Sequence, residues 1–392
     1  MSKYAPLGGS LITRTTVIAG TLVAIMAGLV LYRFVFGLGA VTHMSNGYPW
    51  GLWIVYDVMI GTAFACGGYA MALVVYVFNK GEYHPLVRPA LLASMFGYTL
   101  GGVSVIFDIG RYWNAWHLVT PGYANPTSVM LEVALCIMAY VLVMWIEFTP
   151  VFAEKWANAE TKRKINKVLF VFIAVGVLLP TMHQSSLGGM MVAYGYWIHP
   201  LWQTDLVPLL YLISALAMGY SIVVFEATLV TSVYKRPSEG HLLASISTYI
   251  LWLLVAYLVI RWADIAVQGK LGLVATSGRL SVMFLLENLL LGLPVLLLAG
   301  AARRAKAQIQ FISAVCMLAG AGLYRIDGYL VAYNRPGWHY FPSLGEVMVT
   351  VGIIAFEVLA YIVFVKRLPV LHAAASPKDN QRAPHLAATT NK

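Results

Sequence analysis

Long apolar stretches separated by short polar segments dominate the chain. Ten such stretches, each of about 20 residues, follow one another between residues 17 and 367. Because a helix of about 20 residues crosses the roughly 30 Å hydrocarbon core of a bilayer, each stretch predicts a membrane-spanning helix. The predicted spans are 17–36, 52–78, 86–109, 129–153, 166–184, 206–232, 246–265, 280–300, 308–326 and 346–367. The pattern therefore predicts an all-α integral membrane protein with ten transmembrane helices.

The polar segments divide the chain into three parts. Residues 1–16 form an N-terminal segment, 17–367 the ten-helix domain, and 368–392 a tail rich in Ala, Pro and Asn that predicts disorder. The first span is longer than the apolar region of a signal peptide and lacks a small-residue cleavage site, so we expect it to be retained.

The composition excludes a soluble domain. The chain of 392 residues is 60% hydrophobic and only 11% charged, and such a surface could not be kept in water. Its three cysteines lie inside apolar spans without paired spacing, so the sequence predicts neither an iron–sulfur cluster nor a metal site in this chain.

The basic residues predict the orientation in the membrane. Alternate loops and both termini hold 19 of the 26 Lys and Arg residues, which places both termini in the cytoplasm. The net charge of +10 is thereby explained as a topology signal at the lipid surface and not as a nucleic-acid site. The other basic residues lie in the opposite loops or at span ends: Arg33, Arg111, Arg261, Lys270, Arg279, Arg325 and Arg335.

The loops predicted on the outer face are rich in aromatic residues. They include residues 46–51, 111–117, 194–200 and 334–342. An interfacial aromatic belt explains part of this enrichment, but such a belt should line both faces. Because Tyr, Trp and Arg also concentrate at protein contacts, we expect a docking surface for a partner subunit on this face.

Several ionisable residues lie within the predicted spans, where charge is expensive. Arg88, Tyr98, Glu132 and Glu226 lie at different depths and could pass protons across the membrane. The alternative is that the carboxyl groups are neutral and join helices by hydrogen bonds. Glu287 and Glu357 lie in the last spans, with no obvious series of proton-exchanging groups around them.

Asp108 and Arg111 are only three residues apart, at the predicted outer end of the third span. Groups at this spacing on a helix can meet, so we expect an ion pair there.

The histidines argue against a haem. Of nine histidines, only His183 lies at the edge of a predicted span, shortly after the helix-breaking Pro180. A transmembrane b-type haem needs histidine ligands from facing helices, and the chain does not supply two at that depth.

Four motifs resemble the NrfD/PsrC family of quinone-reactive membrane subunits. They are Pro-Trp-Gly-Leu-Trp at 49–53, Tyr-His-Pro-Leu-Val-Arg-Pro-Ala at 83–90, Asp-Ile-Gly-Arg-Tyr-Trp-Asn at 108–114 and Leu-Pro-Thr-Met-His-Gln-Ser-Ser at 179–186. The resemblance covers almost the whole chain and is nearest to the HybB-like branch, which serves hydrogenase-2 type [NiFe] hydrogenases.

The resemblance implies helices arranged as NrfD/PsrC-like four-helix bundles in the bacterial inner membrane. It also implies partners on the periplasmic side, namely an iron–sulfur ferredoxin-like subunit and the small and large subunits of a [NiFe] hydrogenase. Electrons would pass between the iron–sulfur subunit and a quinone, menaquinone, without haem. The residues it implicates in proton transfer are Arg88, Tyr98, Arg111, Glu132, His183 and Glu226.

A polar group of residues near the outer face is the predicted quinone site: Trp53, Asp57, Arg111, Glu132 and His183. The predicted activity is energy-coupled H2:quinone oxidoreduction, with the hydrogen site on another chain. Two alternatives stay open. The catalytic partner could reduce polysulfide, nitrite or another acceptor, or the chain could be a proton-coupled transporter, whose membrane carboxylates would look similar.

Overall fold

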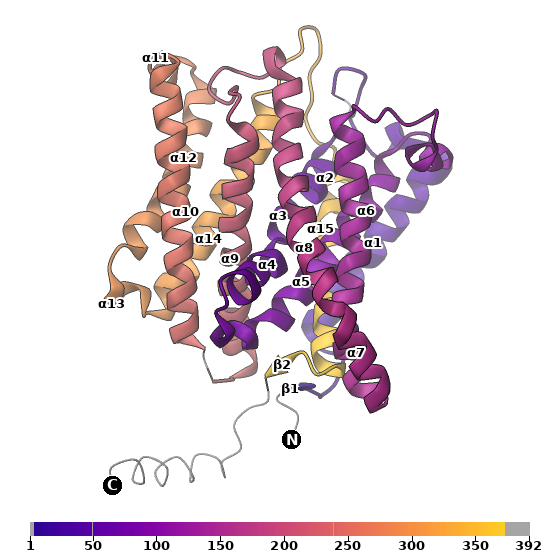
Figure 1. The fold of residues 1–392 in the computed structure, drawn as a ribbon. Coiled ribbons are helices and arrows are strands. Elements are labelled where there is room, and N and C mark those ends of the chain that lie inside the picture. Colours follow the sequence, from indigo (N-terminus) through magenta and orange to yellow (C-terminus); the bar gives the residue numbers. More distant parts are fainter. Residues whose placement is uncertain (1–3, 49, 238, 373–392) are drawn as a thin grey trace.

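A computed structural model describes residues 4–48, 50–237 and 239–372, most of which lie in helices (Figure 1). Within these residues, ten helical segments are long and apolar enough to span a membrane, which confirms the ten predicted spans. They are Arg14–Phe36, Leu52–Val77, Gly81–Asp108, Val129–Trp156, Ala159–Ala193, Val207–Tyr234, Gly240–Val267, Arg279–Leu298, Ala307–Val331 and Leu344–Arg367.

Most spans are built from one regular helix. These are α1 (Arg14–Phe36), α5 (His84–Asp108), α6 (Val129–Glu147), α8 (Ala159–Ala193), α9 (Val207–Tyr234), α10 (Gly240–Val267), α12 (Arg279–Leu298), α14 (Ala307–Ile326) and α15 (Leu344–Arg367). Short connecting elements are η1 (Leu38–Ala40), η4 (Gly81–Tyr83), η5 (Tyr112–Val119), α7 (Thr149–Trp156), η6 (Gly195–Trp197), α11 (Leu271–Thr276) and α13 (Ala301–Arg304).

The second span is segmented and is the most deeply buried of the ten. It runs through α2 (Leu52–Ile54), the π-helix η2 (Val55–Gly61), α3 (Thr62–Phe64), α4 (Gly67–Ala72) and the π-helix η3 (Leu73–Val77). A third π-helix, η7 (Asp327–Val331), continues α14. π-Helical turns are frequent at functional sites, so these segments indicate where the site lies.

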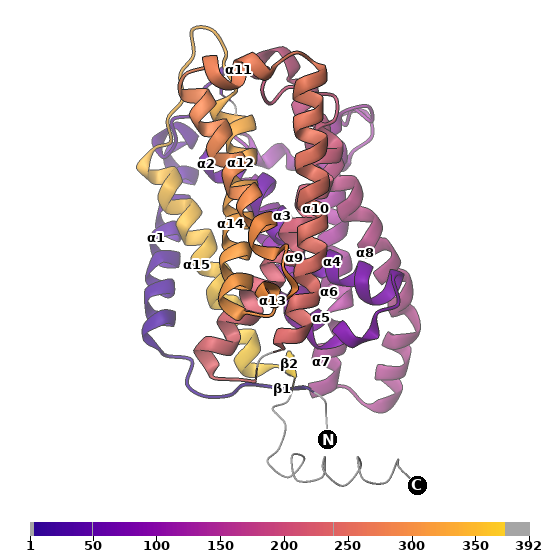
Figure 2. The same cartoon turned by 90° about the vertical axis from the view of Figure 1, so that its left-hand side faces the viewer.

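The spans pack into two groups of four. In the first group, the second span contacts α5, α5 contacts α6, α6 contacts α8, and α8 returns to the second span. In the second group, α9, α10, α12 and α14 close a ring in that order. Helix α9 joins the groups by packing on both α8 and α4, while α1 and α15 form a pair at one edge (Figure 2).

A short sheet ties the two ends of the chain together. Strand β1 (Tyr4–Ala5) pairs antiparallel with β2 (Leu371–His372), at the end of the molecule opposite α11 (Figure 1). We call the end with β1 and β2 the termini end, and the end with α11 the opposite end.

The predicted boundary of the disordered tail is wrong. Leu368, Val370 and Leu371 are buried, and β2 extends to His372. These apolar side chains join a hydrophobic cluster with α5 and α6 residues, which holds the segment in place. The rest of the predicted tail, residues 373–392, lies outside the described residues.

The predicted break at Pro180 is also wrong, because α8 continues through it from Ala159 to Ala193. Proline removes one backbone hydrogen bond and deprives the carbonyl four residues earlier of its donor. Helices in a membrane tolerate this loss when neighbouring helices pack around the site, and α8 packs closely on both α6 and α9.

Candidate functional site

A network of buried polar side chains lies where the two groups of helices meet. Tyr98 on α5 is fully buried. Its hydroxyl lies 3.7 Å from Cys66 Sγ and accepts a hydrogen bond from Gln184 Nε2 at 3.5 Å. The rings of Tyr140 and His183 stand edge-on to the Tyr98 ring, with centroids 4.6 and 5.6 Å away. Both hydrogen bonds and aromatic packing therefore hold the Tyr98 side chain in place.

Thr62 connects the two polar residues of α8 in this network. Its hydroxyl donates to the carbonyl oxygen of Val58, so it accepts from both His183 Nε2 at 3.2 Å and Gln184 Nε2 at 3.1 Å. This arrangement places a proton on His183 Nε2. Thr62 follows the π-helix η2 directly. The predicted position of His183 at a span edge is wrong, since its side chain is fully buried within α8.

Arg325 joins this network from α14. It donates to Gln184 Oε1 at 3.4 Å and to Ser214 Oγ at 3.1 Å, and its guanidinium carbon lies 4.6 Å from the Tyr211 ring centroid. In the described part of the chain it makes no ion pair. A fully buried cation thus faces the network with neutral partners only.

Arg33 and Arg325 lie in the last turns of their helices, as expected for span ends, and together with Arg261 they are buried. Arg33 donates to the carbonyl oxygens of Phe107 and Ile109. Each of these arginines finds partners on another helix, and such partners cannot be identified from hydropathy along one span.

Glu132 lies beside the same helix α8, towards the opposite end. Ser186 lies three residues after His183 on α8, and its hydroxyl donates to Glu132 Oε1 at 2.7 Å. Glu132 lies in the first turn of α6 and is exposed. The structure thus joins Tyr98 to His183 through Gln184 and Thr62, and it places the Glu132–Ser186 pair one turn further along α8.

A second group of predicted residues lies on the second span. Trp53 and Asp57 are both buried, and Trp53 Nε1 donates to Asp108 Oδ1 at 2.6 Å. Among the described residues, neither carboxyl oxygen of Asp57 has a hydrogen-bond partner. Gly101 allows α5 to approach here, because a Cβ atom on it would stand 3.1 Å from the carbonyl oxygen of Asp57.

The predicted ion pair between Asp108 and Arg111 is absent from the described residues. Helix α5 ends at Asp108, and the extended backbone of Ile109 directs the chain away before Arg111. The Arg111 side chain is exposed. Asp108 is bonded to Trp53 instead, so Arg111 is not joined to the other candidates.

Arg88 and Glu226 lie near the termini end but are not joined to each other by a hydrogen bond or ion pair among the described residues. Arg88 forms a two-bond ion pair with Glu154, at 2.6 and 2.9 Å, and stacks 3.7 Å from the centroid of the Tyr4 ring. Glu226 lines a cavity of about 250 Å³ together with Glu239. Glu226 thus lines a cavity, whereas Arg88 is held by an ion pair and by ring stacking.

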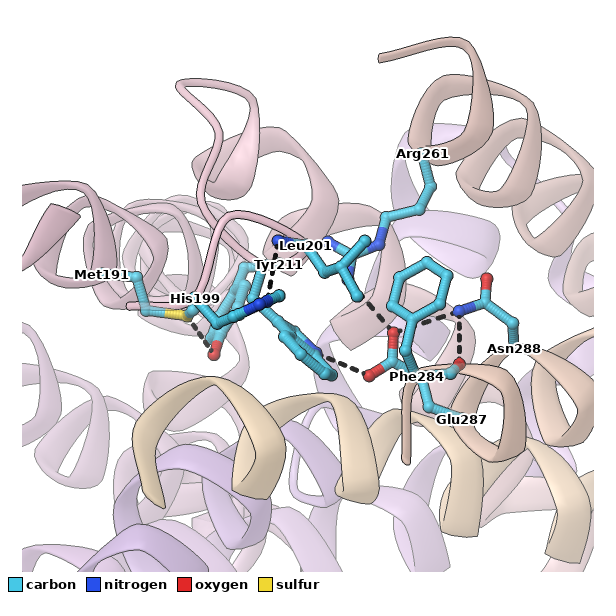
Figure 3. Close-up of polar contacts among 9 residues, drawn as sticks. Met191, His199, Leu201, Tyr211, Arg261, Phe284, Glu287 and Asn288 are labelled. Carbon is cyan, nitrogen blue, oxygen red and sulfur yellow. Dashed lines mark hydrogen bonds and ion pairs between the residues drawn. The ribbon is translucent and has the colours of Figure 1, made fainter. Parts of the chain in front are cut away.

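The second group of four helices contains its own polar cluster, around Glu287 on α12 (Figure 3). The Glu287 carboxylate accepts from Arg261 at 3.2 Å and from Trp202 Nε1 at 2.8 Å. Arg261 is 1% exposed and Glu287 is fully buried. Glu287, around which the sequence indicated no obvious series of proton-exchanging groups, thus has a cation and an indole as partners.

Sequence reasoning missed several members of the network: Thr62, Cys66, Gln184, Ser186, Ser214 and Arg325. One signal was visible, because residues 183–186 are four consecutive polar residues within an apolar stretch. Arg325 and Asp327 gave a second signal, since they place opposite charges two residues apart at the end of a span.

Comparisons with known proteins agree with this architecture. The chain matches the family described as "Polysulphide reductase, NrfD" over residues 40–333. It is 45% identical to the "Probable Ni/Fe-hydrogenase 2 b-type cytochrome subunit" of Escherichia coli (strain K12), over 93% of this chain and 94% of the relative.

Two more distant relatives carry other names. The "Menaquinone reductase, integral membrane subunit" of Nitratidesulfovibrio vulgaris is 28% identical over 58% of this chain and 56% of its own length. A selenate reductase subunit of Mesobacillus selenatarsenatis is 22% identical over 86% of this chain and 88% of its own length.

Proposed function

Because the chain belongs to the NrfD family of membrane subunits, we propose that it is the quinone-reactive membrane subunit of a [NiFe] hydrogenase. In this role it passes electrons between an iron–sulfur partner and menaquinone, and it moves protons through the membrane. The observation that carries the proposal is the buried network around Tyr98, which links α5, α8 and α14. The names of the hydrogenase and menaquinone reductase relatives support the two ends of the electron route.

The proposed orientation places the termini end in the cytoplasm of a bacterial inner membrane. Lys155 and the basic residues 162–164 lie on α7 and the start of α8, and Lys155 donates to the carbonyl oxygen of Arg367 close to β2. Positive charge collects on the cytoplasmic side of membrane proteins. The two rings of four helices would then be the four-helix bundles of the family, and we call them the first and the second bundle.

The opposite end offers a surface for the partner. The loops between α5 and α6, between α8 and α9, and before α15 expose large aromatic side chains there. They are Trp113, Trp116, Tyr123, Tyr196, Trp338 and Phe341. Exposed aromatic residues concentrate at protein interfaces. The proposed occupants are the iron–sulfur subunit in direct contact, with the small and large hydrogenase subunits beyond it.

The second span supplies groups that fit a quinone headgroup, which takes up two electrons and two protons when it is reduced. Asp57 offers two buried oxygens without a partner among the described residues. Trp53 is buried on the same span as Asp57, and His183 is buried on the neighbouring helix α8. Glu132, held by Ser186, lies on the outer side. A small number of polar groups in a mostly apolar pocket is typical of cofactor-binding sites. Arg111 would take part from the exposed loop.

The proposed proton route starts at the cavity beside Glu226. Glu357 is near Glu226 and interacts with it electrostatically. Its Oε1 atom lies 3.4 Å from the position that a Cβ atom on Gly97 would take, next to Tyr98.

From Tyr98 the route follows the hydrogen bonds through Gln184 and Thr62 to His183. It then reaches Glu132 through Ser186. Arg88, paired with Glu154, would take part at the cytoplasmic start of this route.

The name of the hydrogenase relative mentions a b-type cytochrome, but the residues of this chain do not fit a haem. Such a haem needs two facing histidines inside the membrane. His183 is buried in a span, and its Nε2 is bonded to Thr62. Among the described residues, the histidines outside the membrane interior are His43, His84, His117, His199, His241, His339 and His372. We therefore propose electron transfer without haem.

The test replaces Glu132 by Gln and measures H2-dependent menaquinone reduction in membranes that contain the complete hydrogenase complex. Glu160→Gln is the matched control, because Glu160 is exposed and pairs only with Lys164 on the same helix. We expect a large loss in the Glu132 variant and none in the control. Undiminished turnover would remove Glu132 from the route.

The identity of the catalytic partner needs a separate measurement. The 45% identity to a hydrogenase subunit favours a hydrogenase over a reductase of another acceptor. Purification of the chain with its native partner should recover nickel. A partner that contains molybdenum and no nickel would replace the hydrogenase in this proposal by another reductase.

A further inference from the structure

The second bundle contains two carboxyl groups in contact. Asp327 is the first residue of the π-helix η7 and is fully buried. Segment η7 packs on α12, which carries Glu287, and the carboxyl groups of Asp327 and Glu287 interact with each other. No donor from the described residues reaches either oxygen of Asp327. Two ionised carboxylates that interact in a buried site repel each other strongly, and a proton shared between them removes the repulsion.

The charge around this pair balances when it holds one proton. Arg261 is the cation that directly contacts Glu287, so one negative charge on the pair is compensated and a second is not. Arg325 is on the same helix as Asp327 but directs its guanidinium to Gln184 and Ser214. One proton on the pair therefore makes the group of Glu287, Asp327 and Arg261 neutral.

Each neighbouring element contributes groups that face the pair or its cation. Helix α10 provides Tyr257 and Asp264, α14 provides Tyr324, and the loops at the opposite end provide Trp202 and Lys270. Arg325 on α14 acts on Tyr257 and Tyr324. The Arg261 guanidinium carbon lies 4.7 Å from the Tyr324 ring centroid. Burial lowers the pKa of Lys270, which lies outside the spans.

Further polar atoms at the site are unpartnered. Arg261 Nε and Asn288 Oδ1 have no hydrogen-bond partner among the described residues, and their residues are 1% and 8% exposed. Figure 3 shows Asn288 beside Glu287, with Arg261 on the other side of the Glu287 carboxyl. Buried polar atoms without protein partners usually bind internal water. Water at these atoms could carry a proton to and from the pair.

The pair is connected in two directions. Towards the central network, Arg325 lies two residues before Asp327 and donates to Gln184, which donates to Tyr98. Towards the opposite end, Glu287 follows the start of α12 by eight residues, or about 12 Å at 1.5 Å per residue. Trp202 bonds Glu287 there, and its ring centroid lies 6.1 Å from that of His199.

From these contacts we propose that Glu287 and Asp327 form a second proton-binding site. The site holds one proton between two carboxyl groups and exchanges it with the solvent at the opposite end. It lies in the second bundle, outside the quinone site proposed above, and its existence does not depend on which catalytic partner the chain serves.

Infrared spectroscopy of the purified full-length chain in lipid nanodiscs tests the proposal. The spectrum of Asp327→Asn, subtracted from that of the wild type, should show the loss of one protonated-carboxyl C=O band. The wild-type band should shift after transfer to D2O. Asp264→Asn is the control, because Asp264 lies in the same bundle and accepts from Gln268; it should lose carboxylate bands only.

Loss of carboxylate bands in Asp327→Asn would show that both groups are ionised and would overturn the proposal. A C=O band that does not shift in D2O would overturn the exchange. If Asp327→Asn does not accumulate, Glu287→Gln is measured in the same way, since removing either carboxyl group removes the shared proton.

Discussion

The two bundles bury polar groups in different ways. In the first bundle, Tyr98, Thr62 and His183 are neutral groups joined by hydrogen bonds, several of them long. In the second bundle, Arg261 and Glu287 form a direct ion pair in a fully buried position. Arg325 contacts Ser214 and Tyr211 within the second bundle and also donates to Gln184 of the first.

The two kinds of polar contact suit different roles in the protein. Weak hydrogen bonds between neutral groups can rearrange at small cost, which suits proton transfer and ligand binding. A buried ion pair is costly to break, because either partner alone is left as an uncompensated charge. The hydrogen bonds of the first bundle can thus rearrange, whereas the second bundle keeps Arg261 and Glu287 in fixed contact beside the proton proposed between Glu287 and Asp327.

The largest effect is expected when the fixed ion pair is broken. Arg261→Met leaves Glu287 without its cation and should destabilise the protein by about 3–5 kcal/mol. Thermal unfolding in detergent measures the effect, with Arg279→Met as the control, because Arg279 is exposed on the same bundle. Equal unfolding temperatures for the two variants would mean that the second bundle does not depend on the ion pair.

The next largest effect is expected on the rate of quinone reduction, when a proton-transfer group of the first bundle is removed. Tyr98→Phe keeps the ring contacts to Tyr140 and His183 and removes only the hydroxyl. Loss of a proton-transfer group typically slows a reaction by about 100-fold or more, so we expect such a loss of H2-dependent quinone reduction with little change in stability. Tyr69→Phe is the control, since its hydroxyl contacts Thr181 in the same bundle. Similar rates for the two variants would exclude Tyr98 from proton transfer.

A smaller effect is expected at Thr62. Thr62→Val keeps the shape of the side chain but leaves the nitrogen donors of His183 and Gln184 without their acceptor. The cost should be about 1–3 kcal/mol of stability, which chemical unfolding can measure. Thr350→Val is a comparable control, because the Thr350 hydroxyl bonds only to the carbonyl oxygen of Glu346 on its own helix. A smaller loss at Thr62 than at Thr350 would contradict the role of Thr62 as a connection.

The smallest effect on stability is expected at Arg111. Its side chain is exposed, and surface substitutions usually change stability by no more than about 0.5 kcal/mol. Arg111→Gln should therefore unfold like the wild type and affect only assembly or quinone reduction in the complete complex. Marked destabilisation of the isolated chain would reveal an internal role for Arg111.

The spans were predictable because length and apolar composition alone decide whether a helix can cross a bilayer. The burial of Tyr98 in the third span followed from its position in the middle of an apolar stretch. The assembly of the site was less predictable. Gln184 stands beside His183 in the sequence, but its contacts to Thr62 and Arg325 depend on how three separate helices pack.

The buried arginines show the limit most clearly. Arg261 and Arg325 interrupt apolar stretches, and hydropathy therefore places them near the membrane surface. Their actual burial depends on Glu287 in one case and on Ser214 and Gln184 in the other. A single sequence does not identify these partners, because none of them lies within one helical turn of its arginine.

Proton uptake by reconstituted vesicles tests the central claim most directly. The complete complex is inserted with the termini end facing a trapped pH indicator, and H2 is supplied with menaquinone. The account predicts that quinone reduction consumes protons from the termini end, and that Glu226→Gln abolishes this uptake. Unchanged uptake in the Glu226 variant, or proton consumption from the opposite end in the wild type, would contradict it.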